Sequence, residues 1–137
     1  MAHLVHFKKL ESVPSSSLAG MMRLPDDCCR LPMNVNFTEV NTYGLIDVRE
    51  EGETKDHQMM YTVTITYQTH DRALPDFRHN SFRLTALNGK QYLLGSHERP
   101  YPTVKKSTPT PSKPSESTLT TVVVSLLSSA PLLYIEE

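Results

Sequence analysis

Residues 59–68 read MMYTVTITYQ and carry the clearest strand pattern in the chain. Tyr61, Val63, Ile65 and Tyr67 alternate with threonines at positions 62, 64 and 66. An alternation with a period of two places each set of side chains on its own face of a β-strand. The pattern therefore predicts a strand that buries its apolar and aromatic face and leaves its threonine face more exposed to solvent.

The stretch before it predicts a partner strand. Over residues 43–51, Ile46 and Val48 fall on one face, and Asp47 and Arg49 fall on the other. Residues 52–56 read GETKD, a polar run that begins with glycine and is typical of a turn. We expect residues 43–51 and 59–68 to form an antiparallel pair around this turn.

A second hairpin is predicted around Asn88-Gly89, which separates FRLTAL (82–87) from KQYLL (90–94). Asn-Gly between two apolar runs favours a two-residue type I′ turn, in which both residues have a positive φ. That turn would place Leu84 opposite Leu93. Phe82, Leu84 and Leu93 would then share the face that points toward the core.

Further strands are predicted at residues 119–127, which are nearly all apolar or β-branched, and at 132–135, after Pro131. No stretch has a sustained helical period, so the predicted class is all-β, a small antiparallel β-sandwich or β-barrel over residues 34–137. The predicted core consists of Tyr61, Val63, Ile65, Leu84, Leu93, Val122 and Val124. Residues 107–117 are rich in Ser, Thr and Pro. They form either a long solvated loop or an extended ligand for a partner.

Residues 1–33 are expected to form an extended N-terminal arm. Beyond a short strand at residues 4–8, Pro14, Gly20, Pro25 and Pro32 interrupt the pattern. The arm has more apolar residues than a solvated tail, and these are the candidate interface residues: Leu18, Met21, Met22, Leu24, Leu31 and Met33. They either cover the body of the same chain or dock on a neighbouring one.

Composition limits the functional classes. The 137 residues suit one domain, and 14 basic against 15 acidic residues give a net charge of −1, which argues against sequence-specific nucleic-acid binding. Residues 119–135 are interrupted by Ser, Thr and Pro and are too short for a membrane helix. The N-terminus lacks the order of a secretory signal, and the adjacent Cys28 and Cys29 are expected as reduced thiols in a loop.

No catalytic or metal signature is found in the sequence. The six histidines have no ligand spacing typical of a metal site, and Glu50, Glu51 and Glu53 are expected to form a solvated acidic strand end. The five glycines form no phosphate-binding loop. We therefore expect a protein that is not an enzyme and uses no cofactor and no metal.

The second half of the chain resembles small structural proteins of tailed phages and prophages, over about residues 60–137. The resemblance lies in three consecutive pieces: the strand, Asn-Gly and YLLGS segment at 82–96, the RPYP motif at 99–102, and the terminal strand, SSAP and short apolar end at 119–135. It implies a virion component near the tail or neck, assembled in the host cytoplasm.

The expected function is thus assembly, with other copies of the chain and other structural proteins as partners. Exposed strand edges and the apolar residues of the arm would make the contacts. The alternative is a soluble intracellular binding module that recruits a partner through its Pro-rich loop.

Overall fold

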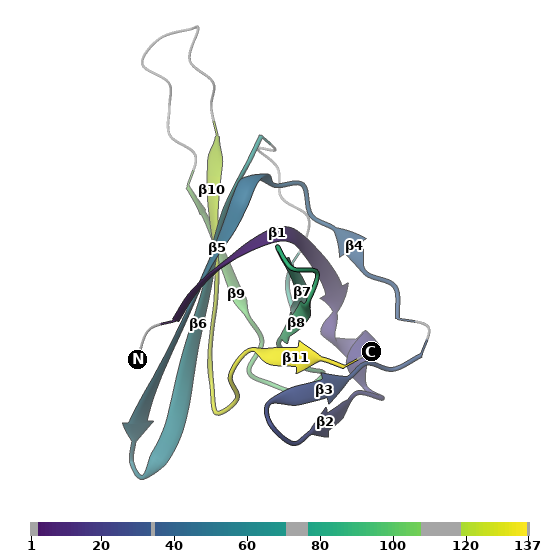
Figure 1. Cartoon of the computed structure of the whole chain (residues 1–137), viewed down its shortest axis with the longest axis vertical. Helices are drawn as coiled ribbons and strands as arrows, with labels where there is room; N and C mark the ends of the chain where they lie inside the picture. The colour runs from purple at the N-terminus through teal and green to yellow at the C-terminus, as the bar shows by residue number, and fades with distance from the viewer. Residues whose placement is uncertain (1–2, 34, 71–76, 108–118, 137) are drawn as a thin grey trace, which may run out of the picture.

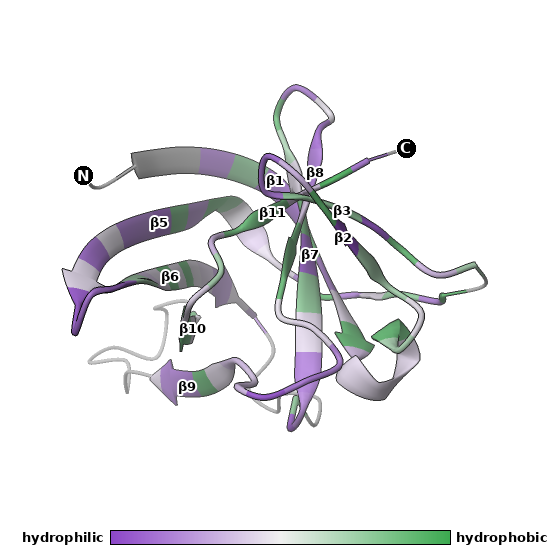
Figure 2. Ribbon diagram, turned by 90° about the horizontal axis from the view of Figure 1, so that it is seen from below, coloured by the Kyte–Doolittle hydropathy of each residue, from purple (hydrophilic) through white to green (hydrophobic). Residues whose placement is uncertain are grey.

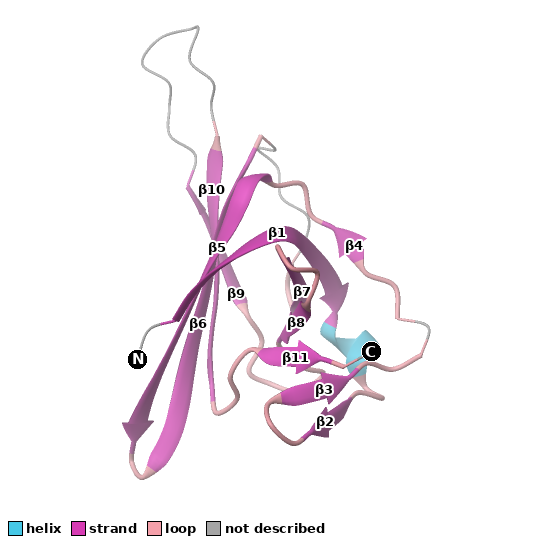
Figure 3. Ribbon diagram, in the orientation of Figure 1, coloured by secondary structure: helices cyan, strands magenta, loops and turns pink. Residues whose placement is uncertain are grey.

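The computed structural model of the chain describes residues 3–33, 35–70, 77–107 and 119–136, and it confirms the all-β class (Figures 1 and 3). One short 3-10 helix, η1 (Ser15–Leu18), follows the first strand. The strands are β1 (His3–Pro14), β2 (Met22–Leu24), β3 (Cys28–Arg30), β4 (Thr38–Glu39), β5 (Tyr43–Lys55), β6 (Gln58–Thr69), β7 (Asn80–Ala86), β8 (Gln91–Leu94), β9 (Thr103–Ser107), β10 (Thr120–Ser128) and β11 (Leu133–Ile135).

All eleven strands belong to one curled sheet, in the order β2-β3-β11-β8-β7-β1-β5-β6-β10-β9, with β4 added to β1 (Figure 2). Neighbouring strands are antiparallel except β3 and β11, which are parallel. Within the described residues β2 and β9 are the two open ends of this order, so the sheet does not close into a barrel.

The expected N-terminal arm is wrong, because β1 lies in the middle of the sheet between β5 and β7. A β-bulge between Phe7 and Lys9 makes the full length of the strand difficult to recognise from the sequence. The inserted residue breaks the alternation, so Phe7 and Leu10 both enter the main core although they are three positions apart. Val13 then enters a second cluster instead.

The core is divided into two clusters. The main cluster lies inside the curl and takes its side chains chiefly from β1, β5, β6, β7 and β10. The second cluster contains Val13, Leu18, Cys29, Leu93, Leu133 and Ile135. Leu94 belongs to the main cluster and Leu93 to the second, so β8 contributes to both through alternate faces.

The predicted strand phases are confirmed for β5, β6 and β10. Ile46 and Val48 are buried and Asp47 and Arg49 are exposed. The residues of the predicted core that are fully buried are Val63, Ile65, Leu84, Leu93, Val122 and Val124. Tyr61 is half-buried, while Thr62 is exposed and Thr64 and Thr66 are half-buried.

The β7–β8 hairpin differs from its prediction by one residue. Leu84 pairs with Tyr92 rather than with Leu93. The Gly89 N–H donates to the Ala86 carbonyl at 3.0 Å, and the Ala86 N–H donates to the Lys90 carbonyl at 2.8 Å. The loop therefore has three residues, with a positive φ of 89° at Gly89 only, as in a type I turn with a bulge. The extra loop residue turns Leu93 to the opposite face from Leu84.

The two-residue turn with two positive φ values lies instead between β5 and β6. Lys55 pairs with Gln58, which leaves Asp56 and His57 as the loop, at φ values of 52° and 64°. The predicted turn at 52–56 is thus placed too early, because residues 52–55 continue the strand. Gly52 belongs to the pairing, and the Tyr61 ring lies over it: a Cβ on Gly52 would be 3.1 Å from Tyr61 Cε1.

The Pro-rich prediction falls mainly outside the described residues, which stop at Ser107 and resume at Leu119. The strands on either side of that gap, β9 and β10, pair with each other in antiparallel fashion.

Candidate functional site

A groove runs along the open end of the sheet at β9. It has a volume of about 800 Å³ and is lined by residues 77–79, residues 99–104 and Lys106. We call it the seam groove, because it lies between the terminal strand β9 and the segment that leads into β7. Residues more than 20 positions apart in the chain thus meet in one surface.

Aromatic residues support one part of this groove. Phe77 is buried and packs edge-on against Phe82, with 5.3 Å between ring centroids. His79 and Tyr101 place their rings 4.7 Å apart with a tilt of 35°. Tyr101 belongs to the Arg99-Pro100-Tyr101-Pro102 motif, so this motif forms one wall of the seam groove.

The charged side chains in the described lining of the seam groove are basic. Its lining includes Arg78, Arg99 and Lys106, together with His79. No aspartate or glutamate is among the described residues that line it. Coulomb attraction at such a surface favours carboxylates or other anions over cations.

A smaller hollow of about 290 Å³ lies between β2, the β8–β9 connection and the β10–β11 connection. Its lining is mixed, with Met21, Leu93 and Leu126 beside Arg23, Glu98 and Arg99. Both signs of charge are present, so this hollow has a less distinct preference for a ligand than the seam groove.

The six predicted interface residues do not form one surface. Leu18 is fully buried in the second cluster, so it covers the body of its own chain, which is the first of the two alternatives. Met21 and Leu31 pack partly buried against the same cluster, and Leu24 is half-buried. Met22 and Met33 are exposed, at 55% and 90% of their surface. The residues of the seam groove were not predicted as a site; only the RPYP motif within it stood out in the sequence.

The two cysteines are free thiols and lie in strand β3 rather than in a loop. Burial chiefly, and the neighbouring Cys28 to a smaller degree, raise the pKa of Cys29 against a lowering effect of Arg23, to about 11. Cys29 is therefore protonated at neutral pH, which makes it a poor nucleophile.

Among the described residues, no group of three His, Cys, Asp or Glu side chains could hold a metal ion. The same residues contain no helix with the length and apolar character that a membrane crossing requires.

Comparison of the chain with protein-family models, with curated proteins and with solved structures finds no match.

Proposed function

We propose that this chain is a non-enzymatic assembly protein, a component of the tail or neck of a phage particle, which packs against its neighbours through open strand edges. The observation that carries this proposal is the open end of the sheet at β9. In the described structure β9 pairs with β10 on one side and has no partner strand on the other. An unpaired strand edge presents backbone N–H and C=O groups that can pair with another chain.

The composition of β9 supports a selective contact rather than indiscriminate aggregation. This strand is five residues long and carries Lys105 and Lys106, both exposed. Short edge strands with lysines resist pairing with arbitrary strands. Positively charged lysines on the edge strand favour a partner strand that carries carboxylates.

The position of the phage-like motif supports the same surface. Arg99-Pro100-Tyr101-Pro102 leads directly into β9 and lines the seam groove. The part of the chain that carries the resemblance is therefore also the part that borders the open edge.

A proline scan of β9 tests the proposal. Successive residues of an edge strand direct their N–H groups alternately toward the sheet and away from it. One of the two variants, Lys105→Pro or Lys106→Pro, removes a backbone hydrogen bond to β10. The other removes only an N–H group that faces the open edge of the sheet. We expect wild-type protein to sediment as species larger than its 15.5 kDa monomer.

The variant that blocks only the outer edge should keep its circular dichroism spectrum and lose association. Wild-type protein that stays monomeric at every concentration would overturn the proposal, and is what the alternative of a recruiting module requires. Unchanged association in both folded variants would also overturn a contact through β9.

A further inference from the structure

The tip of the β5–β6 hairpin projects beyond the rest of the sheet (Figure 1). Pairing of β1 with β5 ends at Glu50, and pairing of β10 with β6 ends at Tyr61. In the described structure residues 51–60 therefore pair only within the β5–β6 hairpin. We call them the ribbon. A two-stranded hairpin is marginally stable in water by itself, so a ribbon of this kind gains from a partner surface.

The ribbon is acidic and exposed. Glu51, Glu53 and Asp56 stand against one basic residue, Lys55, and all four are exposed. Met59, with 47% of its surface exposed, pairs with Thr54 and so lies on the opposite face of the ribbon from Glu51 and Glu53. The carboxylate face is therefore free of exposed large apolar side chains within the ribbon.

We infer that the ribbon of one copy docks in the seam groove of a second copy, head to tail; this inference rests on the assembly function proposed above. The ribbon brings the carboxylates of Glu51 and Glu53 on one face. The seam groove offers Arg99 beside the Tyr101 ring, in a described lining whose charged side chains are all basic. The two surfaces are thus complementary in charge.

The partner is a second copy because one chain carries both halves of the contact. Within a single chain no ribbon residue lines the seam groove, so the contact is not made internally in the described structure. Direct pairing of two β9 strands is a poorer arrangement, since it would bring Lys105 and Lys106 of both copies together. A head-to-tail contact repeats from copy to copy and gives either a ring or a filament.

Charge reversal on each half of the contact tests the inference. Glu53→Lys alters the ribbon and Arg99→Glu alters the seam groove, and both positions are exposed, so both variants should fold. Each variant alone should associate at least about tenfold more weakly than wild type in sedimentation velocity. Glu39→Lys reverses another exposed strand glutamate, on β4, and should associate like wild type.

Mixing the two variants distinguishes a contact between ribbon and seam groove from a general loss of electrostatic attraction between copies. The unaltered ribbon of Arg99→Glu can enter the unaltered groove of Glu53→Lys, so the mixture should regain association. Zero-length carbodiimide cross-linking of mixed light and heavy isotope-labelled wild type should join a ribbon carboxylate to a β9 lysine between copies.

The possible failures are separable. If wild type associates and both variants associate equally well, the inference is wrong and assembly proceeds through another surface. If only Arg99→Glu weakens association, the groove accepts a different acidic segment, and the inference is again wrong. A wild type that remains monomeric overturns the inference together with the proposed function.

Discussion

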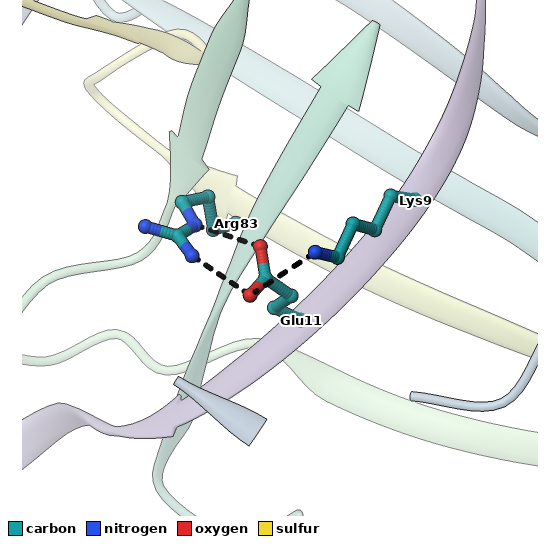
Figure 4. A network of polar contacts seen from close by, with 3 residues as sticks. All are labelled: Lys9, Glu11 and Arg83. Atoms are coloured by element: carbon teal, nitrogen blue, oxygen red, sulfur yellow. Dashed lines mark hydrogen bonds and ion pairs between the residues drawn. The ribbon is translucent and has the colours of Figure 1, made fainter. Parts of the chain in front are cut away.

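Glu11 on β1 accepts two hydrogen bonds from Arg83 on β7, from Nε at 2.9 Å and from Nη2 at 2.7 Å (Figure 4). The two residues are direct cross-strand partners. Lys9 adds a weaker ion pair at 3.9 Å, and the Arg83 guanidinium lies 3.9 Å from the centre of the Phe37 ring. Only 6% of Glu11 is exposed, so the ion pair is largely shielded from solvent. The pair fixes the register of β1 against β7. A slip of one residue would leave the carboxylate buried without its partner.

Removing one member of this pair should therefore destabilise the fold. We expect Arg83→Met to lower the free energy of unfolding by roughly 3 kcal/mol, the lower end for buried pairs because 20% of the Arg83 side chain is exposed. Urea denaturation measures the loss. The double variant Glu11→Met/Arg83→Met should lose clearly less than the sum of the two single variants. Strict additivity would show that the two side chains are not coupled.

Deletion of residues 1–14 should abolish the β-sheet rather than merely prevent assembly. β1 pairs with both β5 and β7, and Phe7 and Leu10 are fully buried in the main cluster. We expect the truncated chain to lose its β-type circular dichroism spectrum. Leu10→Ala offers a milder test, with an expected loss of about 2–5 kcal/mol. A truncated chain with an unchanged spectrum and thermal transition would show that β1 is dispensable.

Two glycines with positive φ should respond differently to alanine. At Gly89 a Cβ would meet no atom within 4 Å, so Gly89→Ala bears only the backbone strain, about 1 kcal/mol. At Gly95, with φ of 101°, a Cβ would lie 2.6 Å from Ser81 Oγ, which itself contacts Ser15 Oγ at 2.7 Å. Gly95→Ala should cost at least about 1 kcal/mol more than Gly89→Ala. Thermal denaturation of both variants measures this difference, and equal midpoints would contradict it.

Local patterns in the sequence predicted the regular strands and missed the irregular ones. In β6 polar and apolar residues alternate without a break, so both the strand and its buried face follow from the sequence. In β10 the nearly continuous run of apolar and β-branched residues predicts the strand, but the run does not alternate and so does not mark the buried face. In β1 the bulge after Phe7 shifts the alternation, and the strand resembles an interrupted arm. In β7–β8 the strands were found, but one additional loop residue changed the pairing, and with it the face of Leu93.

The candidate site depended on tertiary structure to a greater degree. Residues 77–79 and 99–106 become one groove only because the sheet ends at β9 and the segment before β7 lies beside it. The acidic residues at 50–53 were visible in the sequence. Their projection as part of a ribbon follows from where β1 and β10 stop pairing, which no local pattern records.

Alkaline pH should destabilise the protein through Cys29. Burial raises the pKa of this thiol from 9.0 to about 11, so the folded state holds a proton that the unfolded state releases above pH 9. The stability contributed by Cys29 is complete below pH 9 and is lost as pH rises toward 11, by about 2–3 kcal/mol in all. The comparison is made against Cys29→Ala, which keeps every other side chain of the protein. Urea denaturation at pH 8 and pH 10.5 should show a steeper fall in the free energy of unfolding for wild type than for the variant.

Cys29→Ala will be less stable at pH 8, because it leaves a gap in the second cluster. The two curves of stability against pH should therefore converge as the pH rises. An equal fall in both proteins would mean that the Cys29 thiol ionises with the same pKa in the folded and unfolded chains, which its burial between Val13, Leu18 and Leu93 argues against.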